Sequence, residues 1–246
     1  RESQRLGLGL DVATGTAEVA IQICRHRPQT RVIGIDFSPK MLAIGLEKVR
    51  SRGLGHRIQL SLGDARKLPV KSESVDALTI AFGIRNIQER RLTLAEFRRV
   101  LKPNGCIVVT TWEKSWDEHW GWFDELVKTH LPPEPEASEP VESDSASQPV
   151  FDTPEGVEAI LSKAGFADIQ TVFEAADFVY ATEDEYWSTL WSHGARVSLE
   201  KIEQSTGADG LDKFKSDVFK KVQTIKQTDG IHQLFPVLFA LATKEA

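Results

Sequence analysis

The chain has 246 residues, a length that suits one α/β domain with an elaboration or a small cap. Hydrophobic residues make up 41% of it and charged residues 27%, so the chain can bury a sizeable core and is not of the disordered class. The formal net charge of -6 repels phosphate backbones, so we expect no nucleic-acid partner.

The first half of the chain alternates short apolar runs with amphipathic stretches. This pattern predicts strands at 8–13, 31–37, 56–65, 74–82 and 106–112, with helices at 16–27, 39–52 and 88–101 between them. Ser38 is the expected N-cap of the second helix, with Pro39 at its first position. Strands that alternate with helices form parallel sheets covered on both faces, so the fold class is α/β and doubly wound.

The second half of the chain is less regular. Residues 113–150 comprise an aromatic-rich helix and an acidic loop rich in proline and serine, which we interpret as a lid over the core at 1–112. Residues 151–246 are expected to complete the sheet, with a helix at 154–164, strands at 167–180 and 232–244, and a helical cap insertion at about 182–230.

The first strand–turn–helix carries the most informative site. The run from Asp11 to Ala17 places a carboxylate at the strand end, followed by small residues and a helix start. Small side chains let a ligand lie against the backbone, where free N–H groups at the helix start face it. The alternative is that any tight turn between a strand and a helix prefers small residues.

Two further carboxylates end the next strands. Asp36 lies where doubly wound nucleoside-binding folds hold a ribose, and Asp64 is in a position to meet an adenine amine. Each has a simpler interpretation, as a helix N-terminal charge for Asp36 and a turn aspartate for Asp64. The first turn contains only Gly15 in place of the Gly-x-Gly-x-x-Gly that a pyrophosphate needs, so a ligand without phosphates fits better.

The runs DVATGTAEVA, VIGIDFSPKML, GDARKLPVKSESVDALTIAFGIRN and EFRRVLKPNG resemble the successive motifs of class I S-adenosylmethionine-dependent methyltransferases. They are most similar to the group that contains the ubiquinone and menaquinone C-methyltransferases, over about residues 8–112. The resemblance implies a Rossmann-like, mostly parallel seven-stranded sheet that ends with the strands at 167–180 and 232–244. It also implies S-adenosylmethionine as cofactor, with S-adenosylhomocysteine as product. The cofactor-binding residues implied are Asp11, Ala13, Thr14, Gly15, Thr16, Asp36, Phe37, Met41, Gly63, Asp64, Ala65, Ala81, Phe82 and Gly83.

The chain also departs from the family pattern. Thr14 and Ala17 occupy positions where the family often has glycine, and about fifty residues separate the last two predicted strands. The helices that usually precede the first strand do not occur in the chain. It begins at Arg1 without a methionine, which leaves open a natural N-terminal segment ahead of it.

All six tryptophans fall in the segments that the family uses as substrate lids. An aromatic cluster suits an apolar or planar acceptor. The candidate substrate-binding residues are Trp112, Trp116, Trp120, Trp187 and Trp191. The alternative is that these rings only attach the cap helices to the sheet.

Methyl transfer needs a general base only if the acceptor must lose a proton. His193 is the first candidate, followed by His119 and Tyr186, with a purely structural role as the alternative for a lone histidine. No histidine, cysteine or carboxylate group has metal-ligand spacing, so we expect no metal.

Nothing in the sequence predicts a membrane or secreted protein. No apolar run reaches the roughly 18 residues that a membrane helix needs, and no signal peptide is visible. Cys24 and Cys106 lie in apolar runs and are expected to be reduced, which suits the cytoplasm. The sequence defines no oligomeric state.

We therefore expect a methyltransferase that acts on a small hydrophobic or aromatic acceptor. Two alternatives stay open: methylation of a quinone ring carbon, and a non-catalytic module that binds S-adenosylmethionine or regulates a partner. Neither the acceptor nor the methylated atom can be read from the sequence.

Overall fold

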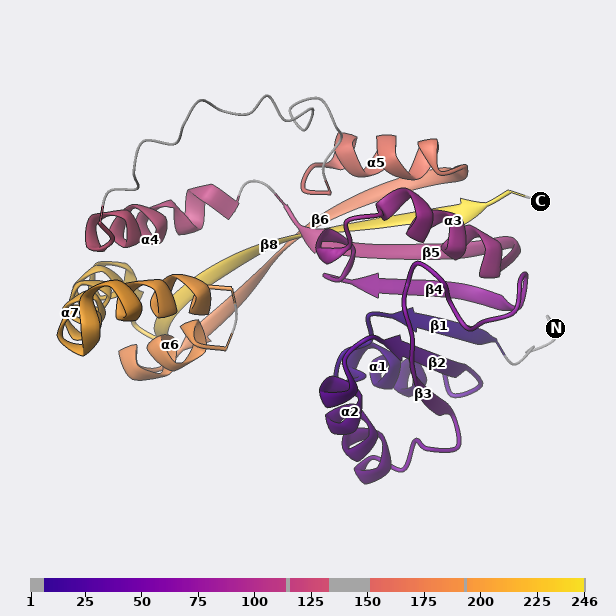
Figure 1. Ribbon diagram of the computed structural model, residues 1–246, viewed down its shortest axis with the longest axis horizontal. Coiled ribbons are helices and arrows are strands. Elements are labelled where there is room, and N and C mark those ends of the chain that lie inside the picture. The colour runs from indigo at the N-terminus through magenta and orange to yellow at the C-terminus, as the bar shows by residue number, and fades with distance from the viewer. Residues whose placement is uncertain (1–6, 114–115, 133–150, 193, 246) are drawn as a thin grey trace. The chain divides into compact units, whose positions relative to one another are not determined.

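Five parallel strands from the first half of the chain form most of one sheet (Figure 1). They are β1 (Leu8–Val12), β2 (Arg31–Asp36), β3 (Ile58–Leu62), β4 (Val75–Ala81) and β5 (Leu101–Trp112). Two long strands, β6 (Phe166–Tyr180) and β8 (Gly230–Lys244), complete the order β3-β2-β1-β4-β5-β8-β6, in which β8 runs antiparallel to β5. The predicted doubly wound, mostly parallel seven-stranded sheet is confirmed.

The computed structural model describes residues 7–113, 116–132, 151–192 and 194–245. The chain divides into two compact units. The first unit comprises Arg1–Glu113, Pro149–Glu174 and Val237–Ala246, and the second comprises Lys114–Gln148 and Ala175–Pro236. Strands β6 and β8 contribute residues to both units, and each unit is considered by itself below.

The helices of the first unit are α1 (Glu18–His26), α2 (Pro39–Ser51), the 3₁₀ helix η1 (Ile84–Asn86), α3 (Arg90–Val100) and α5 (Pro154–Lys163). Of these, α2 and α5 begin at the predicted residues, α1 and α3 begin two residues later, and the short 3₁₀ helix is not predicted. Ser38 caps α2 by accepting a hydrogen bond from the backbone N–H of Met41 at 3.4 Å, as predicted. Thr153 caps α5 in the same way, accepting from Gly156 at 3.1 Å. Each cap satisfies a backbone donor that the helix itself cannot pair.

Apolar side chains on the two faces of the sheet form separate clusters. One contains side chains of α3 and α5, such as Phe97 and Leu161, together with Ile35 of β2. The other contains side chains of α1 and α2, together with Val32 of β2. Val32 and Ile35 are three positions apart on one strand, so their side chains point to opposite faces. The helices therefore cover both faces, which explains why the central strands read as nearly continuous apolar runs.

The described part of the second unit is largely helical. It contains α4 (Trp116–His130), α6 (Glu183–Leu190), α7 (Arg196–Ile225) and the short strand β7 (Lys226–Gln227). Within α7 the backbone leaves the helical conformation at Gly207, where φ is 72° and ψ is -174°, so two helical segments follow one another. Phe214 of α7 is fully buried, with ring centroids 5.8 Å from Phe123 of α4 and 6.2 Å from Trp187 of α6. These contacts join the three helices around one aromatic centre.

Two boundaries differ more than the others from the sequence prediction. Strand β5 begins at Leu101 rather than 106, because Leu101 pairs with Val75 before an irregularity brings Cys106 opposite Ala77. Helix α7 ends at Ile225, and the next two residues pair with the start of β8 rather than continuing the helix. In both places backbone pairing with a neighbouring strand overrides a local pattern that resembles a loop or a helix.

Within the described ranges, no helix combines the length and the apolar character that crossing a membrane would require.

Candidate functional site

The order of the strands identifies the carboxyl ends of the parallel strands as the place to look for a ligand. The chain proceeds from β1 to β2 and β3 on one side, then returns to β4 and β5 on the other side of β1. Open α/β sheets bind ligands outside the carboxyl ends of their strands, at this reversal point. A cavity of about 550 Å³ lies there, in the first unit, and is lined by residues that follow β1, β2, β3 and β4.

The loop between β1 and α1 has an unusual backbone conformation. Three alternate residues have a left-handed conformation: Ala13 at φ 54°, Gly15 at 55° and Ala17 at 65°. Thr14 is not among them, so of the two positions where the family often has glycine, only Ala17 has a left-handed backbone. The left-handed conformation brings Cβ close to the following carbonyl oxygen, so the two alanines are strained.

Below this loop, Gly34 of β2 leaves space for Thr14. A Cβ atom at Gly34 would lie 2.9 Å from the Oγ1 atom of Thr14 and 2.6 Å from Leu60. The backbone N–H of Thr14 donates to the carbonyl of Ile35 at 3.0 Å. The loop is therefore seated directly on β2.

Asp11, at the carboxyl end of β1, is buried and joins the loop after β1 to β4 by hydrogen bonds. Its carboxylate is 1% exposed and accepts hydrogen bonds from the hydroxyls of Thr14 at 2.5 Å and Thr79 at 2.7 Å. Burial raises the pKa of Asp11 from 3.8 to about 6, although both hydroxyls act to lower it. Asp11 thus joins β1, its following loop and β4, and does not line the cavity.

Asp36, at the end of β2, lines the cavity and is held in place by backbone donors. One carboxylate oxygen accepts from the N–H of Gly15 and the other from the N–H of Ser38, both at 2.8 Å. Each oxygen retains a lone pair for a ligand donor. The next residue, Phe37, is 78% exposed although it is a large apolar side chain, and Met41 is 41% exposed. An exposed aromatic ring beside a fixed carboxylate suits a ligand with a planar apolar part and hydroxyl groups.

Asp64, after β3, already accepts hydrogen bonds from Arg66. Arg66 donates to both of its carboxylate oxygens, at 2.7 Å for the shortest contact, and these hydrogen bonds lower the pKa of Asp64. Another nitrogen of Arg66 reaches Glu89, just before α3, at 2.9 Å. Arg66 therefore bridges two carboxylates of the cavity wall, and Asp64 must share its acceptors with Arg66 to receive a ligand amine.

The carboxyl end of β4 approaches the β1 loop closely. A Cβ atom at Gly83 would lie 2.6 Å from the Cβ atom of Ala13, so glycine is needed there. Phe82, at φ 57°, turns its ring onto Trp112 of β5, with centroids 4.2 Å apart and planes at 32°. The guanidinium of Arg85 lies over the same indole at 5.9 Å. An aromatic wall thus stands beside the cavity, at the ends of β4 and β5.

The cavity includes half of the predicted cofactor residues. Those that line it are Ala13, Asp36, Phe37, Gly63, Asp64, Ala65 and Gly83. Those that do not line it are Asp11, Thr14, Gly15, Thr16, Met41, Ala81 and Phe82. The sequence analysis missed Val12, Ile35, Arg66, Asn86, Ile87, Gln88 and Glu89. The last four follow β4, and the rule that strand ends meet at one edge would have found them.

The candidates for general base and acceptor binding fall mainly in the second unit. His193 lies outside the described residues, and so do the side chains of His119, Trp116 and Trp120, whose backbone is in α4. Tyr186 is described: it is 1% exposed, and its hydroxyl donates to Gln233 at 3.1 Å. Burial raises the pKa of Tyr186 well above its usual range, which disfavours the ionised form; a role as general base stays a prediction.

The other two candidate tryptophans, Trp187 and Trp191, contact each other, and Trp187 also contacts α7. The rings of Trp187 and Trp191 lie edge to face at 6.4 Å, and Lys215 lies 5.8 Å from the Trp187 ring. Their proposed contact with an acceptor stays a prediction. Across residues 7–113, 116–132, 151–192 and 194–245, no group of three or more histidine, cysteine or carboxylate side chains could hold a metal ion.

The sheet order, the reversal point and the strand-end carboxylates define the α/β fold class of S-adenosylmethionine-dependent methyltransferases. Residues 2–122, just under half of the chain, match the model of the ubiE/COQ5 methyltransferase family. The resemblance inferred from the motifs is therefore confirmed.

One curated relative agrees with the family match, and two solved structures agree with the fold. The chain is 46% identical over 101 residues to a demethylmenaquinone methyltransferase of Porphyromonas gingivalis, a match that spans 41% of each chain. The fold is similar to that of the YcgJ protein of Bacillus subtilis, with a TM-score of 0.61 at 15% identity, covering 100% of this chain and 94% of that one. It is also similar to phosphoethanolamine N-methyltransferase 2 of Haemonchus contortus, crystallised with S-adenosylhomocysteine, with a TM-score of 0.55 at 21% identity. That match covers 98% of this chain and 49% of the other.

Replacing Ala13 with glycine should stabilise the protein. Glycine adopts the left-handed conformation without strain, so we expect the free energy of unfolding to rise by about 0.5–1 kcal/mol, the strain relief less the entropy that glycine loses on folding. Urea denaturation measures this. As the matched control, Ala20→Gly lies inside the right-handed α1 and should destabilise by about 1 kcal/mol. A lower stability for both variants would contradict the strain at Ala13.

The buried carboxyl of Asp11 should make stability depend on pH. Because its folded-state pKa of about 6 exceeds the usual 3.8, the folded chain binds the proton more tightly. Above pH 6 the ionised carboxylate therefore costs stability, and this cost is relieved as pH falls from 6 toward 4. Asp11→Asn should be more stable than the parent at pH 7.5 by on the order of 2 kcal/mol, with the difference shrinking as the pH is lowered.

Denaturant titrations of both chains at several pH values measure this difference. Glu125→Gln, which alters an exposed carboxylate of α4, is the control and should leave the pH profile unchanged. A constant difference between Asp11→Asn and the parent at every pH would contradict the raised pKa.

Proposed function

We propose that the protein is an S-adenosylmethionine-dependent methyltransferase whose cofactor occupies the cavity at the carboxyl ends of β1–β4. The observation that carries this proposal is the charge of the cavity wall. Asp36, Asp64 and Glu89 line it with a single cation, Arg66, so the wall has a net charge of -2. A sulfonium cation is attracted to such a wall, whereas the pyrophosphate of a dinucleotide is repelled.

The residues of the cavity fit the parts of this cofactor. The spare lone pairs of Asp36 suit the two ribose hydroxyls, and the exposed Phe37 suits a face of adenine. Asp64 suits the adenine amine once it shares its oxygens with Arg66. The volume of about 550 Å³ lies within the range of small-molecule sites. In the Haemonchus contortus relative, S-adenosylhomocysteine is bound by a protein of the same fold.

When bound, the cofactor supplies a methyl group that is displaced in line from sulfur. The protein's contribution is then to align the acceptor and to exclude water. The contact between Ala13 and Gly83 fixes the two loops that flank the expected position of the sulfur. Phe82 and Trp112 would present an apolar surface to the acceptor beside it.

The acceptor is proposed to be small, largely apolar and planar. The stacked pair of Phe82 and Trp112, with Arg85 over the indole, favours an aromatic ring that bears polar substituents. A quinone ring carbon is one acceptor of this kind, and it is supported by the name of the Porphyromonas gingivalis relative. The match spans only 41% of that relative's length, and the long α6–α7 segment between β6 and β8 lies outside residues 2–122, which match the family model, so the quinone is the narrower form of the proposal.

Isothermal titration with S-adenosylmethionine, S-adenosylhomocysteine and NADH tests the cofactor. We expect micromolar binding of the two sulfur nucleosides and none of NADH. Asp36→Ala should weaken binding by about 2–3 kcal/mol, roughly 30- to 150-fold, because two ribose hydroxyls lose their acceptor. Glu47→Ala, which removes an exposed carboxylate on α2 away from the cavity, should bind like the parent.

Equal affinities of the parent and Asp36→Ala would overturn the assignment of this cavity. Circular dichroism of each variant separates loss of binding from loss of folding. Methyl transfer to phenolic or quinone acceptors then distinguishes an enzyme from a module that only binds the cofactor. Binding of both sulfur nucleosides without transfer to any acceptor would favour the non-catalytic alternative.

A further inference from the structure

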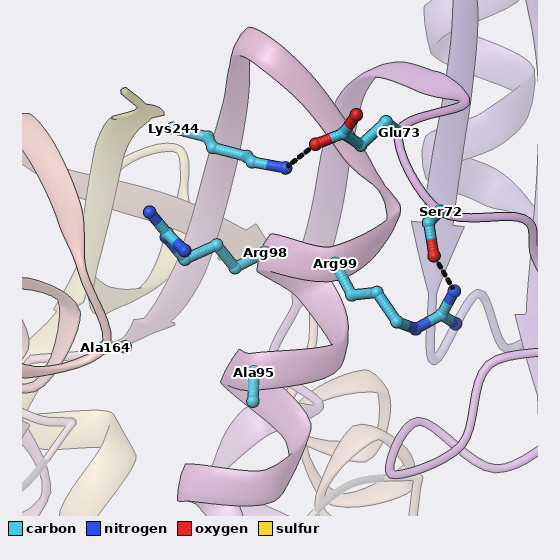
Figure 2. A pocket seen from close by; sticks show the side chains of 7 residues that line it. All are labelled: Ser72, Glu73, Ala95, Arg98, Arg99, Ala164 and Lys244. Carbon is cyan, nitrogen blue, oxygen red and sulfur yellow. Dashed lines mark hydrogen bonds and ion pairs between the residues drawn. The ribbon is translucent and has the colours of Figure 1, made fainter. Parts of the chain in front are cut away.

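The charged side chains of two cavities in the first unit are arranged differently. In a cavity of about 380 Å³ at the amino ends of the parallel strands, Arg98 and Arg99 extend from opposite sides of α3 (Figure 2). Lys244, on the same cavity wall, is already paired with Glu73 at 3.1 Å, so these cations do not meet at one ligand position. In the candidate cofactor cavity, by contrast, hydrogen bonds join the charged groups directly, and their arrangement bears on how a ligand base is recognised.

Arg66 takes up the acceptor positions of Asp64. One carboxylate oxygen of Asp64 accepts from the backbone N–H of Arg66 at 2.8 Å and from its Nε atom at 3.0 Å. The other oxygen accepts from the same Nε atom at 3.0 Å and from a terminal nitrogen at 2.7 Å. A carboxylate has about four lone-pair positions, so a ligand amine must displace one of these donors to bind Asp64.

Arg66 is held in this position from a second side. Another terminal nitrogen donates to Glu89, just before α3, at 2.9 Å. Hydrogen bonds between two ionised groups are stronger than those of a neutral amine, so an adenine amine competes poorly with Arg66 for Asp64. The side chains of Arg66 and Asp64 are 43% and 48% exposed, so water weakens the pair and the cost of displacing Arg66 is modest.

Arg66 also brings donors of its own to the cavity. A guanidinium has five N–H groups, and three of them are used in the contacts with Asp64 and Glu89. Two N–H groups therefore remain, on a side chain that lines the cavity. The wall presents these donors beside a carboxylate whose acceptor positions are already filled.

We propose that Arg66 sets the base specificity of the cofactor site, by masking Asp64 and so weakening the preference for adenine over a purine with an oxo group in place of the amine. This inference rests on the proposed binding of an S-adenosyl nucleoside in this cavity. An amine needs an acceptor, whereas an oxo group needs a donor. An unmasked Asp64 is ionised at neutral pH, because the ordinary carboxyl pKa is about 4, and would accept the amine and repel the oxo group. With Arg66 beside Asp64, the same wall meets either group.

The test compares S-adenosylhomocysteine with its inosine analogue, which carries an oxo group in place of the adenine amine. Isothermal titration gives the ratio of the two dissociation constants for the full chain and for Arg66→Ala. Both ligands have the same charge, so a general change in the charge of the wall cancels in this ratio.

We expect the parent to bind the two ligands within about threefold of each other, because the exposed Arg66–Asp64 pair serves either group at little cost. Arg66→Ala should bind S-adenosylhomocysteine about three- to tenfold more tightly than the parent does. The variant should also prefer it to the inosine analogue by about tenfold or more, because the ionised carboxylate then pairs with the amine and opposes the oxo group.

Lys67→Ala is the matched control, because it removes a cation one position along the chain, from a residue that does not line the cavity. It should keep the specificity of the parent. The loop itself does not depend on the Arg66 side chain. The backbone N–H groups of Arg66 and Lys67 donate to Asp64 at 2.8 and 3.0 Å, and an alanine in place of Arg66 retains the first of these donors.

Two results would overturn the role of Arg66: a parent that already prefers S-adenosylhomocysteine by about tenfold, or equal ratios for the parent and Arg66→Ala. If Asp36→Ala still loses affinity in either case, the proposed cofactor site stands and only the role of Arg66 fails. Absence of binding of both nucleosides to the parent and to Arg66→Ala overturns this role together with the cofactor assignment.

Discussion

The parallel pairing of β1 with both β2 and β4 is the constraint on which the candidate site depends. Asp11 pairs with Gly34 of β2 on one side and with Thr79 of β4 on the other. The carboxyl ends of these three strands therefore lie next to one another. The buried carboxylate then ties the loop after β1 to β4 through two hydroxyls. Without this register, Asp36 would not meet the N–H of Gly15, and Gly83 would not approach Ala13.

Much of this arrangement could be predicted from the sequence, because it follows from local patterns. Apolar runs of five to seven residues bounded by turns define β1 to β4, and the pair Ser38–Pro39 defines the start of α2. The rule that parallel strands end at one edge then places Asp36 and Asp64 on a common cavity. The predictions of the fold that the structure confirms rest on hydrophobic periodicity, helix-capping residues and the order of the strands.

The remaining features of the site depend on contacts between residues that are far apart in the chain and share no local sequence pattern. The pairing of Arg66 with Asp64 could be guessed from their spacing, but its extension to Glu89 joins residues 23 positions apart. The burial that disfavours ionisation of Tyr186 comes from packing within the second unit, which no periodic pattern of one helix reveals. The left-handed backbone at Ala13 could not be predicted either, because a motif of small residues does not show which of them have positive φ.

The two left-handed alanines in the loop after β1 have a thermal consequence. A methyl group at Ala13 or Ala17 strains the folded loop, which is an enthalpic effect. The same methyl group reduces the number of conformations open to the unfolded chain, which is an entropic effect. The entropic benefit grows in proportion to absolute temperature while the strain stays nearly constant. Compared with a loop of glycines, this loop therefore has a deficit in stability that narrows as the protein is warmed, without being reversed in the range where the protein is folded.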